Sequence, residues 1–182
     1  RSGAYAKAAV EYIRSGNLGD IHLVRVFNMK NRSPIGHKED TSVPEGVDYD
    51  RWLGPAPMRA FNPNRFHYCW HWFWDYSGGD IINDGVHQID VARWLIGKGY
   101  PRAVSATGGK FSFDDDQETP DTHTVCMTFD GDRQITWEGL SCNKHGGAFV
   151  TFYGTEGTLE LSADGSHRVF DRSDRLIAEE TG

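Results

Sequence analysis

The sequence predicts an α+β domain, in which one open, mainly antiparallel β-sheet carries helices packed on one face. Helical periodicity is confined to two stretches, residues 4–15 and 80–97. Strand-like stretches gather after Pro101, where short turns separate runs of alternating or β-branched residues. Helices and strands that segregate along the chain in this way are typical of α+β folds rather than of alternating α/β folds.

The chain begins with a predicted helix and a predicted strand. In residues 4–15, apolar side chains that include Ala9 and Val10 recur at helical spacing, and Gly16 follows where a helix C-cap belongs. Residues 21–29 are rich in apolar and β-branched side chains and therefore predict a strand.

A long polar and aromatic segment, residues 31–78, follows this strand and is interrupted by prolines and glycines. Such a long irregular segment is unusual in a compact domain unless it builds a site, so we expect it to contribute to function. Within it, residues 48–53 predict one helical turn, which Gly54 and Pro55 end.

Residues 80–97 predict the strongest helix of the chain, which Gly97 ends. An apolar stripe runs along one side and consists of Ile82, Gly85, Ile89, Ala92 and Ile96. We expect this stripe to face the sheet.

The remaining sequence predicts strands at residues 103–107, 122–130, 133–142, 148–153 and 157–162. In the second of these, Val125, Met127 and Phe129 share one face, and small half-polar residues occupy the other. The following strand alternates in the same way. A half-polar face fits either a solvent-exposed surface or a sheet-to-sheet contact between subunits, and both interpretations stay open.

Composition excludes several classes of protein. The 182 residues suffice for one domain, and 19 Lys and Arg against 26 Asp and Glu give a net charge of −7. This balance argues against nucleic acid and against an anionic membrane surface as partners, and no apolar stretch approaches the ~20 residues of a membrane span. Three separated cysteines exclude a disulfide scaffold and favour a cytoplasmic location. Periplasmic export stays open, because an export signal would lie upstream of Arg1.

Four polar residues near the start of the second helix are candidates for chemistry. They are Asp80, Asn83, Asp84 and His87, and they fall within about one third of the helix circumference. A histidine close to carboxylates can move a proton near neutral pH. The same spacing also fits the solvated face of an amphipathic helix.

The aromatic run at residues 67–76 holds a second group of candidates. Trp72 and Trp74 fit either the wall of a substrate cleft, since aromatic faces pack against the C–H face of a sugar ring, or a plain hydrophobic core. His67 and His71 have a spacing that zinc ligands use, but no second pair of ligands has metal-like spacing, so we expect no metal site.

Two basic residues, Lys30 and Arg65, are further candidates for binding an anion or a hydroxyl group, although most such residues are merely solvated. The sequence holds no G-x-G-x-x-G between a strand and a helix, no P-loop and no G-x-S-x-G. The chain alone therefore has no recognisable dinucleotide fingerprint.

Five longer stretches occur in a characteristic order: AVEYIRSGNLGDIHLVRV, YDRWLGPAP, FHYCWHWFWDYSGGD, GVHQIDVARWLIG and FYGTEGTLEL. Together they span essentially the whole chain, and it resembles the C-terminal domain of the Gfo/Idh/MocA family. The name stands for glucose–fructose oxidoreductase, inositol dehydrogenase and rhizopine catabolism. No single stretch is diagnostic, but five in the family order identify the resemblance.

The resemblance implies a C-terminal domain of the dihydrodipicolinate-reductase-like type, in which residues 1–182 bind the substrate and form a homo-oligomer through the open sheet face. It also implies an N-terminal Rossmann domain upstream of Arg1 that binds NAD or NADP and supplies the lysine of a Glu-Lys-Pro motif. Family members oxidise a secondary alcohol of a sugar or cyclitol, or run the reverse reaction. We therefore expect the substrate half of an oxidoreductase, inactive alone.

The family also implies roles for individual residues. Its Asp-x-x-x-His pair aligns with Asn83 and His87, which suggests His87 as the acid/base and Asn83 as a hydrogen-bonding partner of a substrate hydroxyl. Because Asn does not titrate, Asp80 or Asp84 could restore the carboxylate. The remaining candidates for substrate contact are Lys30, Arg65, His71, Trp72 and Trp74.

Two other functions stay open at this point. The same fold could serve as a non-catalytic carbohydrate-binding or scaffolding module without a cofactor domain. It could also serve as a metal-dependent lyase or hydrolase that uses His67, His71 and His87.

Overall fold

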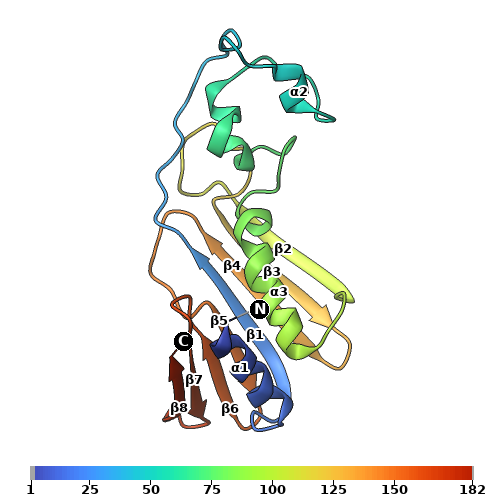
Figure 1. Cartoon of the computed structure of the whole chain (residues 1–182), viewed down its shortest axis with the longest axis vertical. Coiled ribbons are helices and arrows are strands. Elements are labelled where there is room, and N and C mark those ends of the chain that lie inside the picture. The colour runs from blue at the N-terminus through green and yellow to red at the C-terminus, as the bar shows by residue number, and fades with distance from the viewer. Residues whose placement is uncertain (1–2, 182) are drawn as a thin grey trace.

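Eight strands form one open sheet within residues 3–181, the part of the chain that the computed structural model describes. Their order across the sheet is β2-β3-β4-β1-β5-β6-β7-β8 (Figure 1). The strands are β1 (Ile21–Met29), β2 (Ala103–Gly109), β3 (Thr122–Phe129), β4 (Arg133–Leu140), β5 (Val150–Gly154), β6 (Gly157–Leu161), β7 (Ser166–Asp171) and β8 (Leu176–Thr181).

The first strand, β1, lies in the middle of the sheet. It pairs in parallel with β4 and antiparallel with β5, whereas the other neighbouring strands pair antiparallel. The prediction of an open, mainly antiparallel sheet is therefore confirmed.

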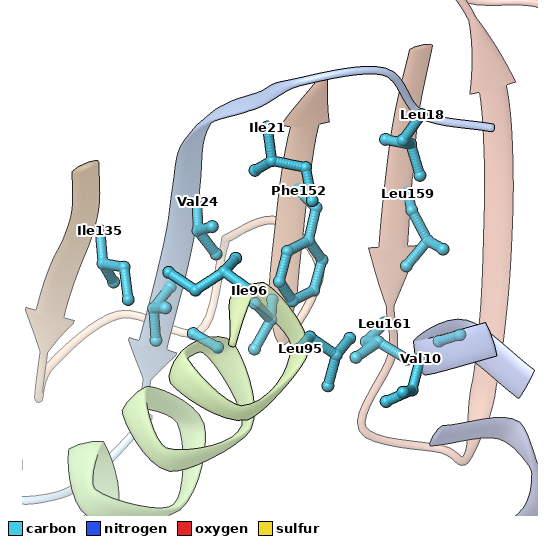
Figure 2. Packing of buried hydrophobic residues seen from close by; sticks show 14 of the residues in the cluster. Val10, Leu18, Ile21, Val24, Leu95, Ile96, Ile135, Phe152, Leu159 and Leu161 are labelled. Carbon is cyan, nitrogen blue, oxygen red and sulfur yellow. The ribbon is translucent and has the colours of Figure 1, made fainter. Parts of the chain in front are cut away.

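Two helices, α1 (Ala4–Arg14) and α3 (Val86–Ile96), lie on the same face of this sheet (Figure 1). Their apolar sides interlock with the sheet: Ile96 reaches toward Val24 and Phe152, and Val10 lies beside Leu161 (Figure 2). Each buried side chain of this size stabilises the fold by about 1.5–3 kcal/mol. None of the helices in residues 3–181 combines the length and apolar character that crossing a bilayer requires.

The strand faces follow the predicted alternation. Val125, Met127 and Phe129 of β3 are buried under the helices, as are Ile135 and Trp137 of β4. The sequence did not predict β7 and β8. β7 carries mostly polar side chains, and every residue of the edge strand β8 is exposed, so neither strand shows a clear apolar alternation.

The predicted regular helix over 80–97 is wrong in its first turn. Ile81–Gly85 form a π-helix, η3, before α3 begins. A π-turn closes i→i+5 hydrogen bonds, so the first turn does not continue the face of the helix that follows. Ile82, predicted on the apolar stripe, is consequently 58% exposed, and Asp80, predicted on the polar side, is 1% exposed.

Two glycines shape this entry to the helix. Gly79 has φ +70°, and a Cβ at this position would lie 2.6 Å from Thr119 Oγ1. At Gly85, a Cβ would come within 3.1 Å of the Trp137 ring. Glycine therefore lets η3 approach the sheet closely.

Residues 30–79 and 110–121 form an arm that extends beyond one end of the sheet (Figure 1). The arm contains α2 (Tyr49–Leu53), confirming the helical turn predicted at 48–53, and the short 3-10 helices η1 (Pro63–Arg65) and η2 (His67–Trp72). It has its own small aromatic core. There Tyr49 stacks on Trp52 with ring centroids 5.7 Å apart, and Phe61 meets Tyr49 edge-on at 5.3 Å.

A buried carboxylate at the base of the arm holds its second segment in place. Asp121 is 0% exposed and accepts backbone N–H groups from Phe111, Ser112 and Phe113 at 3.1, 3.1 and 2.8 Å. It also accepts the Thr122 hydroxyl at 2.9 Å. Burial alone would raise the pKa of Asp121, but these hydrogen bonds outweigh it and lower the pKa.

Candidate functional site

A cavity of about 220 Å³ lies where the arm joins the sheet, and we call it the inner cavity. Its walls come from the segment after β1, from η2 and from the entry to η3. They include Lys30, Arg32, Tyr68, Trp72, Asp80 and Asp84. Four of the sequence-predicted site residues, Lys30, Trp72, Asp80 and Asp84, thus meet at one place.

One rim of the inner cavity is an ion pair. Lys30 Nζ lies 3.3 Å from Asp84 Oδ1, and Asn28 Nδ2 donates to Asp84 Oδ2 at 3.3 Å. The Lys30 side chain is 49% exposed, so solvent screens the pair and its contribution to stability is small. The pair is therefore open to exchange for contacts with a bound polar ligand.

Arg32 forms a second cationic wall that sequence reasoning missed. Its guanidinium carbon lies 3.9 Å from the centre of the Trp72 ring and 5.1 Å from that of Phe113. Its Nη2 donates to Gln117 Oε1 at 2.9 Å. The aromatic stacking and this hydrogen bond hold the charge in a fixed orientation.

Asp80 is the most buried acid of the inner cavity. One carboxylate oxygen accepts the Ser141 hydroxyl, while Oδ1 has no hydrogen-bond partner among the described residues. Burial raises the pKa of Asp80, although the Ser141 hydrogen bond and the charge of Arg32 oppose the shift. The free oxygen is an acceptor for a hydroxyl group that enters the cavity.

Asn83 and His87 do not line the inner cavity. Asn83 is half-buried in η3, and His87 is exposed on the first turn of α3. Their side chains make no hydrogen bond with residues 3–181, whereas Asp84 faces β1 through Asn28. Of the four predicted polar residues, Asp80 and Asp84 thus line the cavity, whereas Asn83 and His87 lie outside its wall.

The remaining candidates lie in the arm, away from the inner cavity wall. His71 is buried, contacts the Tyr68 carbonyl through Nδ1 and stacks on Trp70 at 4.3 Å. Arg65 donates to Asp40 Oδ1 at 2.8 Å and to the Ala60 carbonyl at 2.7 Å.

Trp74 is 59% exposed and lines a different hollow of about 720 Å³, between η3 and the edge strand β2. It therefore faces a separate surface from Trp72. The two tryptophans, predicted together as a cleft wall, are not brought to one cavity.

On the other side of Lys30 lies a pocket of about 500 Å³, which we call the lysine pocket. Its walls include Lys30, Lys144, Gln88, Phe27, Phe149 and Ser162. Lys30 belongs to both spaces, so the two are neighbours. Sequence reasoning missed Lys144 and Gln88, whose surroundings are set by the loop between β4 and β5.

The described residues provide neither a metal cluster nor a dinucleotide cradle. No group of three or more His, Cys, Asp or Glu side chains in residues 3–181 is placed to hold a metal ion, so His67, His71 and His87 do not form one. Dinucleotide binding needs a glycine-rich turn from a parallel strand into a helix. The parallel strands β1 and β4 lead instead into the arm and into a loop before β5.

A protein-family model matches most of this domain. The model for the C-terminal alpha/beta domain of the oxidoreductase family, of the Gfo/Idh/MocA group, matches residues 23–160. The chain belongs to the Gfo/Idh/MocA oxidoreductase family. The match includes most of β1, the whole arm, η3 and α3, so every wall of the inner cavity lies within the family domain.

Solved structures share the fold of this Gfo/Idh/MocA domain at low sequence identity. A levoglucosan dehydrogenase in complex with NADH and levoglucosan is 18% identical with a TM-score of 0.61, over 96% of this chain and 43% of its own. The WlbA dehydrogenase from Bordetella pertussis in complex with NADH and UDP-GlcNAcA is 16% identical with a TM-score of 0.56, over 99% and 44%. An oxidoreductase domain protein from Kribbella flavida is 15% identical with a TM-score of 0.62, over 95% and 43%.

At these identities the likeness establishes the fold alone. The Gfo/Idh/MocA chain described here spans less than half the length of each of these structures. A comparison with curated proteins finds no matching sequence.

Proposed function

We propose that this chain is the substrate-binding domain of an NAD(P)-dependent oxidoreductase that acts on a secondary alcohol of a sugar or cyclitol. The dinucleotide is held by a separate Rossmann domain, because the described residues offer no cradle for it. Membership of the oxidoreductase family supports the reaction class. Solved relatives that carry NADH together with levoglucosan or UDP-GlcNAcA support the substrate class.

The observation that carries the proposal is the inner cavity. It combines an exposed aromatic side chain, Tyr68, with an acceptor, Asp80 Oδ1, and with the charged rim formed by Lys30 and Asp84. A polyol needs this combination, since its C–H face packs on an aromatic ring and its hydroxyls need donors and acceptors.

Asn83 and His87 have a separate role in this proposal. Asn83 lies in η3 and His87 in the first turn of α3, and neither belongs to the wall of the inner cavity. When an alcohol is oxidised, its hydroxyl proton must be removed, and an exposed imidazole can accept it as a general base. Asn83, one turn earlier, can hydrogen-bond the same hydroxyl.

The full-length gene product is expected to reduce NAD or NADP in the presence of at least one sugar or cyclitol. The 182-residue chain mixed with the same cofactor is expected to show no turnover. Absorbance of the reduced nicotinamide across a substrate panel measures both. Hydride transfer by the 182-residue chain alone would contradict the proposal that a separate Rossmann domain binds the dinucleotide.

A non-catalytic carbohydrate-binding module is the second candidate. Two observations favour it: the inner cavity suits a polyol, and the described residues form no dinucleotide-binding site. Sugar binding by the full-length protein without any cofactor reduction would select this second function over the first.

We also propose that the chain self-associates through the open face of its sheet. That face carries the ion pairs Arg25–Glu138 at 3.2 Å and Arg168–Glu160 at 3.1 Å, and Arg25 covers the Phe27 ring at 4.5 Å. Aromatic surface among paired charges is typical of subunit interfaces.

Light scattering of the 182-residue chain is expected to give at least a dimer. Arg25→Glu, which places an acid next to Glu138, should shift the chain toward monomer, while Lys7→Glu at an exposed position of α1 should not. A monomeric wild-type chain at high concentration would contradict this assembly.

A further inference from the structure

The lysine pocket differs in charge from the rest of the protein. The chain carries a net charge of −7, yet two lysines, Lys30 and Lys144, line this one pocket. Among the described residues that line it, none is Asp or Glu. The pocket is thus a local cationic site on an acidic protein.

Its two amino groups are in different states. Lys30 shares its charge with Asp84 on the neighbouring rim, at 3.3 Å. Lys144 is exposed on the loop between β4 and β5 and has no ion-pair partner within residues 3–181. At least one positive charge in the pocket is therefore left without compensation by the protein.

A buried amide supplies a second, independent feature. Gln88 is only 5% exposed, and its Nε2 donates to the Phe27 carbonyl at 2.9 Å. This bond fixes the orientation of the amide, because only the NH₂ end can bond a carbonyl oxygen. Oε1 is left buried without a partner among the described residues. A buried acceptor of this kind calls for a donor from a ligand.

Much of the remaining wall is apolar, and Asn28 and Ser162 are its polar members. Phe27 and Phe149 line the pocket together with Ala148 and Ala163. The volume of about 500 Å³ lies in the range of small-molecule sites. The pocket therefore offers an apolar surface, a hydroxyl acceptor and cationic amines around one space.

We propose that the lysine pocket binds an anionic polyol, with the negative group between Lys30 and Lys144 and a hydroxyl donating to Gln88 Oε1. The inference rests on the proposed function and narrows it. A substrate that extends from the inner cavity past Lys30, which lines both spaces, is then a sugar derivative with a carboxylate or a phosphate. Lysine recognises either group as a point charge.

Binding of three probes to the 182-residue chain tests the proposal: glucuronate, glucose 6-phosphate and glucose, measured by ligand-observed NMR or calorimetry. At least one anionic probe is expected to bind about tenfold more tightly than glucose, because a charge-assisted hydrogen bond is gained. That preference should weaken with added salt. The tighter of the two anions identifies carboxylate or phosphate as the recognised group.

Variants locate the effect. Lys144→Gln is expected to remove most of the preference for the anion, whereas Lys7→Gln on α1, an exposed lysine outside the pocket, should leave it unchanged. Gln88→Leu should weaken the anionic probe and glucose by similar factors, with circular dichroism as the check that the chain still folds.

Three outcomes would overturn the inference. Glucose that binds as tightly as both anions would refute the charged substrate while leaving the proposed function intact. An equal loss with Lys7→Gln and Lys144→Gln would indicate general charge attraction instead of this pocket. No binding of any probe would count against both the inference and the proposed function.

Discussion

His87→Ala in the full-length enzyme is expected to lower kcat by at least ~100-fold, as the loss of a general acid/base does. His87 is exposed on α3 and makes no hydrogen bond with the described residues, so its removal should leave the fold unchanged. Thermal unfolding at the wild-type temperature together with collapsed turnover would therefore indicate a chemical role.

His22→Ala is the matched control, because His22 is another exposed histidine and lies on β1 at the opposite end from the arm. Its turnover should stay close to wild type. Near-normal turnover of the His87 variant would remove this residue from the chemistry and direct attention to Asp80 and Asp84.

Asp121→Ala is expected to destabilise the domain by about 3 kcal/mol, because three backbone N–H groups and the Thr122 hydroxyl lose a charged acceptor at once. For a domain of this size that corresponds to a fall in Tm of ~10 °C. Asp130→Ala, at an exposed turn, is the control and should stay near the wild-type Tm.

The Asp121→Ala substitution is also expected to weaken sugar binding in the inner cavity. Asp121 holds the turn that contains Phe113, and Phe113 packs on the Arg32 guanidinium. Weaker sugar binding by the Asp121 variant below its melting temperature would show this coupling, whereas a loss of stability without a loss of binding would not.

Asp121 also predicts a pH dependence of stability. Its pKa is lowered by folding, so its contribution is complete above the unfolded pKa of about 3.9 and is lost as the pH falls through the lower folded value. Acid unfolding curves of wild type and Asp121→Ala should converge below that pH. A constant difference in stability down to pH 2 would argue against the carboxylate as the cause.

Local patterns explain which parts of the fold the sequence predicted. α1, β1 and the strands from β3 to β6 follow apolar periodicity because each buries one regular side against the core. The edge strand β8 was not predicted because an exposed edge needs no apolar alternation, and β7 was not predicted because most of its side chains are polar. The π-turn was not predicted, because rules based on helical spacing assume a regular backbone. As a result, Ile82 was expected to be buried and is exposed, whereas Asp80 was expected on the polar side and is buried.

The candidate site was predictable where its residues belong to recognisable elements. Lys30 follows a strand, and Asp80 and Asp84 precede a helix, so their neighbourhood could be anticipated from the sequence. Arg32 could not be, because its partners Trp72 and Phe113 come from distant segments that only the folded arm brings together. A non-local contact of this type leaves no periodic signal.

The central position of β1 has a consequence for how the protein is made. β1 leaves the ribosome before the other strands of this sheet, yet its partners β4 and β5 follow only after about 100 further residues. At ~5–20 residues per second, its apolar side waits for ~5–20 s before the sheet can close around it. We expect the nascent chain to need chaperone protection during this interval, and slower translation of the arm to lengthen the exposure.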